Sequence, residues 1–97
     1  MPNATTDVFR RCNLRIVEIL KAFEADGVRN TTSPEFIDAV RALHLIGGRS
    51  IMLDPNGPLV QEALGQVDKL FEDLFDEVNA SPTLRETVKL IIEEAKA

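Results

Sequence analysis

The chain carries a single histidine, His44, and the residues around it are of the types that support nucleophilic chemistry. On a helix, Arg41 lies one turn before this histidine and Gly48 lies one turn after it, so all three share one side. A neutral imidazole keeps a free ring nitrogen at neutral pH. Phosphoryl transfer asks mainly for access, in-line placement and nearby positive charge. The pattern is compatible with a phosphoryl acceptor, and also with an ordinary histidine at the edge of a buried stripe.

Few other residues are arranged for chemistry. Cys12, the only cysteine, lies on the apolar face of its predicted helix, which favours a small core residue over a reactive thiol. One histidine and one distant cysteine do not make a metal site, so we expect no metal and no bound cofactor. The stretch "IGGRS" lacks the lysine and the spacing of a phosphate-binding loop. His44 is therefore the main candidate for chemistry in this sequence.

Length and composition limit the classes of function. The chain has 97 residues and a net charge of −5, which indicates one domain and argues against binding of nucleic acid. A single cysteine permits no internal disulfide, as expected in a reducing compartment. No apolar run approaches the ~18 residues of a membrane span, and the first residues show no secretory signal. We expect one cytoplasmic domain over residues 1–97 that does not insert into a membrane.

Apolar residues recur at three- and four-residue intervals along the chain, and no stretch alternates with a period of two. Ser33-Pro34 and Ser81-Pro82 are typical helix starts, Asp26-Gly27 is a helix end, and "DPNGP" is a loop. The pattern predicts an all-α fold, an antiparallel up-down four-helix bundle. Its helices are expected at about residues 6–25, 34–53, 58–79 and 82–95.

The double glycine Gly47-Gly48 leaves two interpretations for the end of the second helix. A helix that stops there agrees with glycine as a C-terminal signal, because each interior glycine costs about 1 kcal/mol relative to alanine. A helix that continues to Leu53 keeps the apolar register through Ile51. We favour the continuous helix, because the unambiguous loop residues come only at Asp54-Pro55.

A longer pattern surrounds the histidine. From Arg41 to Leu53 the chain reads R-x-x-H-x-I-x-G-x-S-x-x-L. This resembles the phosphorylated helix of the histidine phosphotransfer (HPt) domain of two-component signalling, R-x-x-H-x-[LI]-K-G-x-[SA]-x-x-[LF], particularly the N-terminal domain of chemotaxis histidine kinases. "SPEFIDAV" is similar to the start of that helix, and "QVDKLFEDL" is similar to the family's next helix. Residues 8–95 can be laid along the family.

The resemblance implies a function for His44. It would accept a phosphoryl group and exchange it with the aspartate of a response-regulator receiver domain, or take it from a histidine kinase. The domain would be a phosphoryl carrier rather than an enzyme, either on its own or as part of a kinase. The partner would supply Mg²⁺ and the catalytic pocket, so the chain itself needs no cofactor.

The resemblance also implies supporting residues. The family's lysine, three residues after the histidine, is Gly47 here, so Arg41 or Arg49 would have to balance the phosphoryl charge. A polar residue that hydrogen-bonds the imidazole is expected at Asp68, or at Gln66 if no gap is counted. The expected docking surface for the partner comprises Arg41, Leu45, Gly48, Arg49, Met52, Gln61, Gln66 and Asp68.

Two interpretations without phosphotransfer stay open. A degenerate HPt domain, with Gly47 in place of lysine as its signature, would still dock a receiver domain. An unrelated four-helix interaction protein would use Leu14 and Val17 as its interface, because these residues lie off the main apolar face of the first helix.

Overall fold

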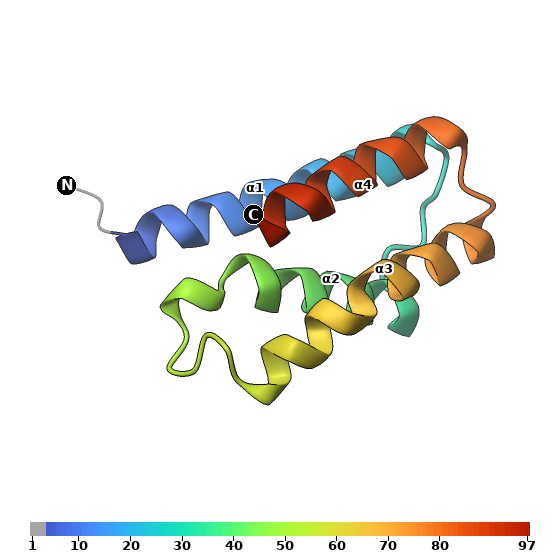
Figure 1. Ribbon diagram of the computed structural model, residues 1–97. Helices are drawn as coiled ribbons and strands as arrows, with labels where there is room; N and C mark the ends of the chain where they lie inside the picture. The colour runs from blue at the N-terminus through green and yellow to red at the C-terminus, as the bar shows by residue number, and fades with distance from the viewer. Residues whose placement is uncertain (1–3) are drawn as a thin grey trace.

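The computed structural model describes residues 4–97 (Figure 1). Within that range the chain forms four α-helices and one short 3-10 helix, and it contains no strand. The elements are α1 (Ala4–Ala25), α2 (Pro34–Gly47), η1 (Arg49–Ile51), α3 (Pro58–Val78) and α4 (Pro82–Lys96). The predicted all-α fold with four helices is confirmed. In residues 4–97 we find no helix that combines the length and the apolarity needed to cross a bilayer.

The starts of α2 and α4 use the predicted serine-proline signals. The hydroxyl of Ser33 accepts a hydrogen bond from the backbone N–H of Phe36 at 3.2 Å, and that of Ser81 accepts one from Leu84 at 3.1 Å. Each bond satisfies a backbone donor that the first helical turn cannot pair by itself. A proline follows each serine at the start of the helix, where its missing N–H has no consequence.

Contacts between helix ends define how the helices run. The rings of Phe23 and Phe36 join the end of α1 to the start of α2, with centroids 5.2 Å apart. Arg85 at the start of α4 pairs with Asp76 at the end of α3. These contacts hold the end of α1 against the start of α2, and the end of α3 against the start of α4. Figure 1 shows the same path, with α1 beside α4 and α2 beside α3.

The core lies between these two pairs of helices and is built around aromatic rings. Phe23 stacks on Phe75 with centroids 6.3 Å apart, and Phe75 lies 6.2 Å from Phe71. Every buried residue in the described chain is apolar. Within residues 4–97 no polar or charged residue is fully buried, and a deeply placed charge is that of Arg15, whose side chain is 11% exposed.

The predicted continuous helix over residues 34–53 is wrong. The α-helix ends at Gly47, and the chain leaves the helical path at Gly48, whose ψ is 9°. The guanidinium of Arg49 then turns back to bond the carbonyl of Ile46 at 2.6 Å, and one turn of 3-10 helix follows. Leu53, the predicted last residue of the helix, is fully exposed at 108%. The double glycine therefore acts as a helix end, and the apolar register beyond it does not continue the helix.

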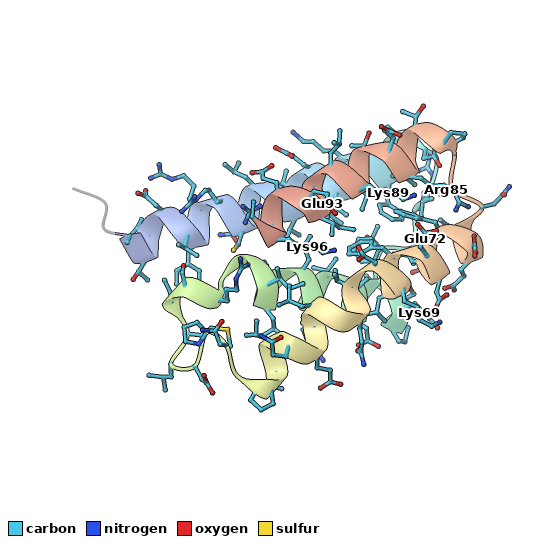
Figure 2. All side chains as sticks on the ribbon, viewed as in Figure 1. Lys69, Glu72, Arg85, Lys89, Glu93 and Lys96 are labelled. Carbon is cyan, nitrogen blue, oxygen red and sulfur yellow. The ribbon has the colours of Figure 1, made fainter. Side chains whose placement is uncertain are left out.

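Charged side chains line the edge between α3 and α4, as Figure 2 shows. Glu72 pairs with Lys89 at 3.3 Å and with Arg85 at 3.8 Å, and Asp68 pairs with Lys96 at 2.8 Å. Partly exposed pairs of this kind contribute at most about 1 kcal/mol each. These carboxylates are thus neutralised by neighbouring cations, as in a solvated ionic surface, and do not form a pair poised for acid–base catalysis.

Asp26 joins the end of α1 to the start of α4. Its carboxylate accepts a hydrogen bond from the backbone N–H of Ser81 at 2.9 Å. The Ser81 hydroxyl, and then its backbone N–H, hold the pKa of the Asp26 carboxyl below its ordinary value. A pKa lowered by folding stabilises the protein above the unfolded-state pKa of about 4, and this stabilisation is lost as pH falls through the folded-state value.

We therefore expect Asp26→Asn to lower the free energy of unfolding at pH 7 and to matter less in acid. Urea unfolding of both proteins at pH 7 and at about pH 3 measures the difference. Asp38→Asn is the matched control, because the side chain of Asp38 makes no hydrogen bond or ion pair within residues 4–97. A deficit of Asp26→Asn that is the same at both pH values would contradict this account.

Candidate functional site

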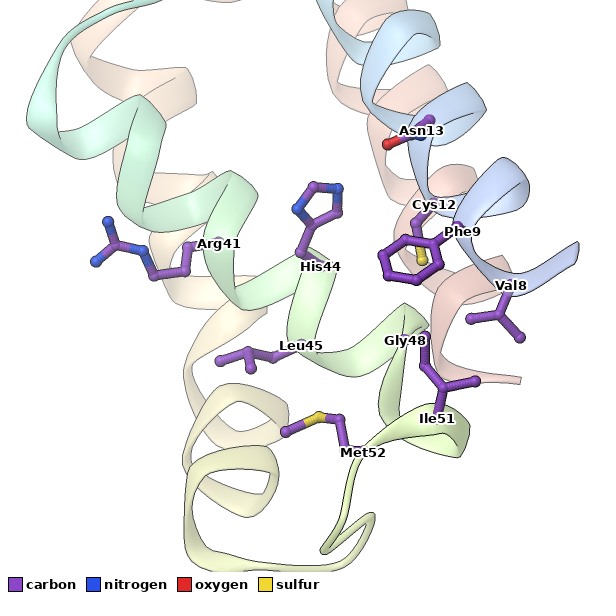
Figure 3. A pocket seen from close by; sticks show the side chains of 10 residues that line it. All are labelled: Val8, Phe9, Cys12, Asn13, Arg41, His44, Leu45, Gly48, Ile51 and Met52. Carbon is purple, nitrogen blue, oxygen red and sulfur yellow. The ribbon is translucent and has the colours of Figure 1, made fainter. Parts of the chain in front are cut away.

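His44 lies in the last turn of α2, and its side chain is exposed to solvent. Within the described chain the imidazole has no hydrogen-bond or ion-pair partner. Figure 3 shows the ring in the space between α2 and α1, while Arg41 extends from α2 in another direction. An exposed imidazole without a partner keeps a nitrogen lone pair available to a reagent that arrives from outside.

A cavity of about 380 Å³ opens beside His44 where α1, the end of α2 and η1 meet (Figure 3). Most of its lining is apolar, and its side chains come from segments far apart in the sequence. The lining residues are Val8, Phe9, Cys12, Asn13, Arg41, His44, Leu45, Gly48, Ile51 and Met52. A surface cavity with this lining suits the apolar side chain of a partner protein, next to one imidazole and one guanidinium.

Gly48 leaves room beside the histidine. A Cβ atom at this position would lie 3.1 Å from the carbonyl oxygen of His44 and 3.8 Å from the sulfur of Cys12. Any side chain here would press on the last turn of α2 and fill the floor of the cavity. Glycine at this position therefore leaves the cavity between α1 and the end of α2 unfilled.

Gly47 faces the interior rather than the cavity. A Cβ atom here would lie 2.8 Å from Nη1 of Arg15 and 3.4 Å from the sulfur of Cys12. The side chain of Arg15 is only 11% exposed and pairs with Glu94 of α4 at 3.7 Å. A lysine at position 47 would thus point toward another buried cation, which explains in physical terms why this chain accommodates glycine there.

Arg49 does not join the cavity. Its Nη1 donates to the carbonyl oxygens of Ile46 at 2.6 Å and Ala95 at 3.0 Å, and its Nη2 donates to Lys96 at 2.9 Å. One guanidinium therefore caps the C-terminal ends of both α2 and α4, where free carbonyls and helix dipoles favour a cation. The prediction that Arg49 belongs to the docking surface beside His44 is wrong, because this side chain is turned toward α4.

Arg49→Met is expected to lower the free energy of unfolding by about 1.5–3 kcal/mol, the usual range for hydrogen bonds to a charged group. Arg49→Lys should recover little of the loss, because one ammonium cannot replace the two-pronged contacts. Arg41→Met is the matched control and should change stability by less than about 0.5 kcal/mol, since Arg41 is exposed and makes no ion pair in the described chain. Equal losses in Arg41→Met and Arg49→Met, measured by urea unfolding, would refute the capping role.

The predicted polar partners of the imidazole lie elsewhere. Asp68 bonds Lys96 on the edge between α3 and α4. Gln66 donates to Glu62 at 3.4 Å and lies in the groove between α2 and α3. Gln61 precedes Asp68 by seven residues and shares its face of α3. None of these three residues lines the cavity beside His44. Gln66 nevertheless shares its groove with Arg41 and Leu45, so α3 still adjoins part of the expected docking surface.

The structure does bring Arg41, Leu45, Gly48 and Met52 together with His44 around one cavity, as the sequence pattern predicted. The residues that α1 contributes were missed as site residues. Phe9 is one of them, and it is 57% exposed at the rim. In the sequence, the only sign of a site residue here is that Phe9 lies at the edge of the apolar face of α1. Such a position does not tell which neighbouring helix the side chain contacts.

Metal chemistry has no evident support in these side chains. Among residues 4–97, no three histidine, cysteine, aspartate or glutamate side chains are grouped closely enough to hold a metal ion. The candidate site thus consists of one exposed imidazole, one exposed guanidinium and an apolar cavity that opens to the surface. Comparison of the chain with protein-family models, with curated protein sequences and with solved structures gives no match.

Proposed function

We propose that this domain is a phosphoryl carrier of the histidine phosphotransfer type, phosphorylated on His44. The observation that carries the proposal is the state of the imidazole: it is exposed, it has no partner within residues 4–97, and it stands beside a cavity that Gly48 keeps open. The arginine-to-leucine pattern around the histidine, from 41 to 53, supports the same function. A carrier of this type acts in the cytoplasm, where its phosphodonors and ATP are found.

The chemical step needs only the ring and a phosphodonor. The lone pair of the unprotonated ring nitrogen attacks the phosphorus of an aspartyl phosphate on a receiver domain. A nitrogen–phosphorus bond forms, and the bond from phosphorus to the carboxyl oxygen breaks, so that the carboxylate leaves with the electron pair. The proton already on the other ring nitrogen remains there or passes to water. The step is reversible in this form, so the same site serves both directions of transfer.

Charge balance at the site depends on Arg41. The phosphoryl group brings negative charge to a chain whose net charge is −5, so a nearby cation favours its arrival. Arg41 lines the same cavity as His44 and makes no ion pair in the described chain. Arg15 and Arg49 are held against α4, and Gly47 carries no side chain, which leaves Arg41 as the arginine that lines the cavity beside His44 and would have to turn toward the ring to act.

The partner supplies what this domain lacks. Within residues 4–97 no polar residue is fully buried, and no group of side chains is arranged to hold a metal ion. Mg²⁺ and the groups that activate the phosphodonor therefore belong to the receiver or kinase domain. The apolar cavity beside His44 provides the docking contact, in which Phe9, Leu45 and Met52 receive an apolar side chain of the partner. The domain is in this sense a substrate and carrier rather than an enzyme.

The direct test is transfer of labelled phosphate to the purified chain. The chain is incubated with a phosphorylated receiver domain, or with a kinase domain and ATP, from the same genome. Phosphohistidine is labile in acid and stable in base, whereas aspartyl phosphate is labile in base, so the stability of the label identifies its acceptor. Label with phosphohistidine stability supports the proposal. The absence of label with every cognate donor contradicts it.

A second candidate function is docking without phosphotransfer. The apolar lining of the cavity and the glycine at position 47 favour this reading, because both are compatible with binding and neither is needed for transfer. In that case His44→Gln leaves the affinity for a receiver domain unchanged, and no label is found on either protein. Titration calorimetry of both proteins against the receiver domain tests the docking, and the presence or absence of label separates the two functions.

A further inference from the structure

The outer face of α1 is unusually apolar for a surface helix. The helix buries Val8, Cys12, Ile19 and Phe23 on its inner face. Three large apolar side chains nevertheless point the other way, with Leu14 at 53%, Val17 at 43% and Leu20 at 36% exposure. They lie within two turns of one another and form a continuous patch rather than scattered surface residues. Apolar patches of this kind on a folded surface mark interaction sites.

Unpaired charges flank the patch. Arg10 lies seven residues before Val17 and Glu24 lies seven residues after it, so the three residues share one line along the helix. Neither Arg10 nor Glu24 has an ion-pair partner within residues 4–97. The charges at the α3–α4 edge, in contrast, pair with each other inside the chain. The two ends of the α1 patch thus carry opposite charges that form no ion pair within the described chain.

We propose that this face binds the same face of a second copy, with the two α1 helices antiparallel and a two-fold axis at Val17. Each residue of an α-helix is rotated by about 100° around the helix axis from the residue before it. Two residues that are equally far before and after Val17 therefore lie at equal and opposite angles from Val17 around the helix. The two-fold axis therefore sets residue i of one chain opposite residue 34 − i of the other. Interfaces of this self-complementary form are the commonest in soluble oligomers.

The residue types on the patch complement one another under this axis. Leu14 faces Leu20 of the other copy, and Val17 faces itself. Arg10 faces Glu24 of the other copy, so the axis creates two opposite-charge pairs at the ends of the contact. A parallel arrangement would set each of these charges against its own copy, which like-charge repulsion opposes. The sequence of the face thus selects the antiparallel pair.

The overall charge of the chain does not oppose this contact. The chain carries a net charge of −5, but α1 holds four cationic and three acidic side chains. The acidic excess therefore lies on the other elements, away from the proposed interface. The contact also leaves the cavity beside His44 to other partners, so this inference does not rest on phosphotransfer.

Sedimentation equilibrium of the whole chain at concentrations up to about 1 mM tests the proposal, because even a weak specific dimer is populated there. The wild type should approach the mass of two chains. Leu14→Glu should weaken association roughly 30-fold or more, since the two-fold axis counts the change twice. Leu90→Glu is the matched control: Leu90 is 66% exposed on α4, outside the patch, and its replacement should leave association unchanged.

Charge reversal tests the antiparallel geometry. Arg10→Glu and Glu24→Arg should each weaken the dimer about threefold, because each places like charges opposite one another at both ends. The double variant restores opposite charges and should regain the wild-type affinity. A mass of one chain at every concentration would overturn the proposal. Association that withstands Leu14→Glu, or a double variant weaker than either single one, would overturn it as well.

The outcome is distinguishable from that of the phosphotransfer test. His44→Gln should dimerise like the wild type, because His44 lies on α2 and takes no part in the α1 contact. Leu14→Glu should still accept phosphate if His44 is the acceptor. Each proposal therefore has its own measurement, and the failure of one does not contradict the other.

Discussion

Replacing His44 by glutamine is expected to abolish labelling of the chain by every phosphodonor that labels the wild type. Glutamine keeps a polar side chain of similar reach but has no nucleophilic nitrogen, because its amide lone pair is delocalised. No second imidazole exists in the chain to take over, since His44 is the only histidine. The loss should be complete rather than partial, which makes it the largest functional effect we predict.

The same substitution should leave the fold intact. The imidazole is exposed and has no partner within residues 4–97, so its removal breaks no hydrogen bond there and opens no cavity. The free energy of unfolding should change by less than about 0.5 kcal/mol, as is usual for such surface sites. Urea unfolding of both proteins checks this before any loss of labelling is assigned to chemistry. Base-stable label on His44→Gln would mean that the acceptor is another residue.

The success of the sequence in predicting the fold has a physical cause. Helix starts depend on residues that are local in sequence, and the hydroxyls of Ser33 and Ser81 bond the backbone three residues ahead. The end of α2 depends instead on Arg49, whose partners Ala95 and Lys96 lie at the far end of the chain. No local pattern contains that contact, so the apolar register beyond Gly47 indicated a longer helix than the structure has.

The same distinction between local and long-range contacts explains which residues of the candidate site were predicted. Arg41, Leu45 and Gly48 surround His44 because spacing on one helix is sufficient to place them. Residues on other helices depend on how the helices are rotated against one another, which one amphipathic pattern does not determine. Asp68 consequently faces α4 rather than α2, and Phe9 of α1 enters the site that sequence reasoning assigned to α2 and α3.

Phe23→Ala is expected to produce the largest loss of stability. Phe23 is fully buried and packs edge-on against Phe36 of α2 and stacked against Phe75 of α3. It is therefore a side chain that joins α1 to both α2 and α3. Truncation removes both aromatic contacts and leaves a cavity between three helices that cannot close without moving one of them. Losses for such substitutions are typically about 3–5 kcal/mol.

Such a loss is a large part of the total stability of about 5–15 kcal/mol for a domain of this size. Phe9→Ala is the matched control, because it makes the same change on the same helix at a side chain that is 57% exposed. Its cost should stay below about 1 kcal/mol. Urea unfolding of the three proteins, read by circular dichroism, gives both differences. Similar costs for Phe23→Ala and Phe9→Ala would mean that α1 is not held by the aromatic core, and the position of its residues beside His44 would then lose its structural basis.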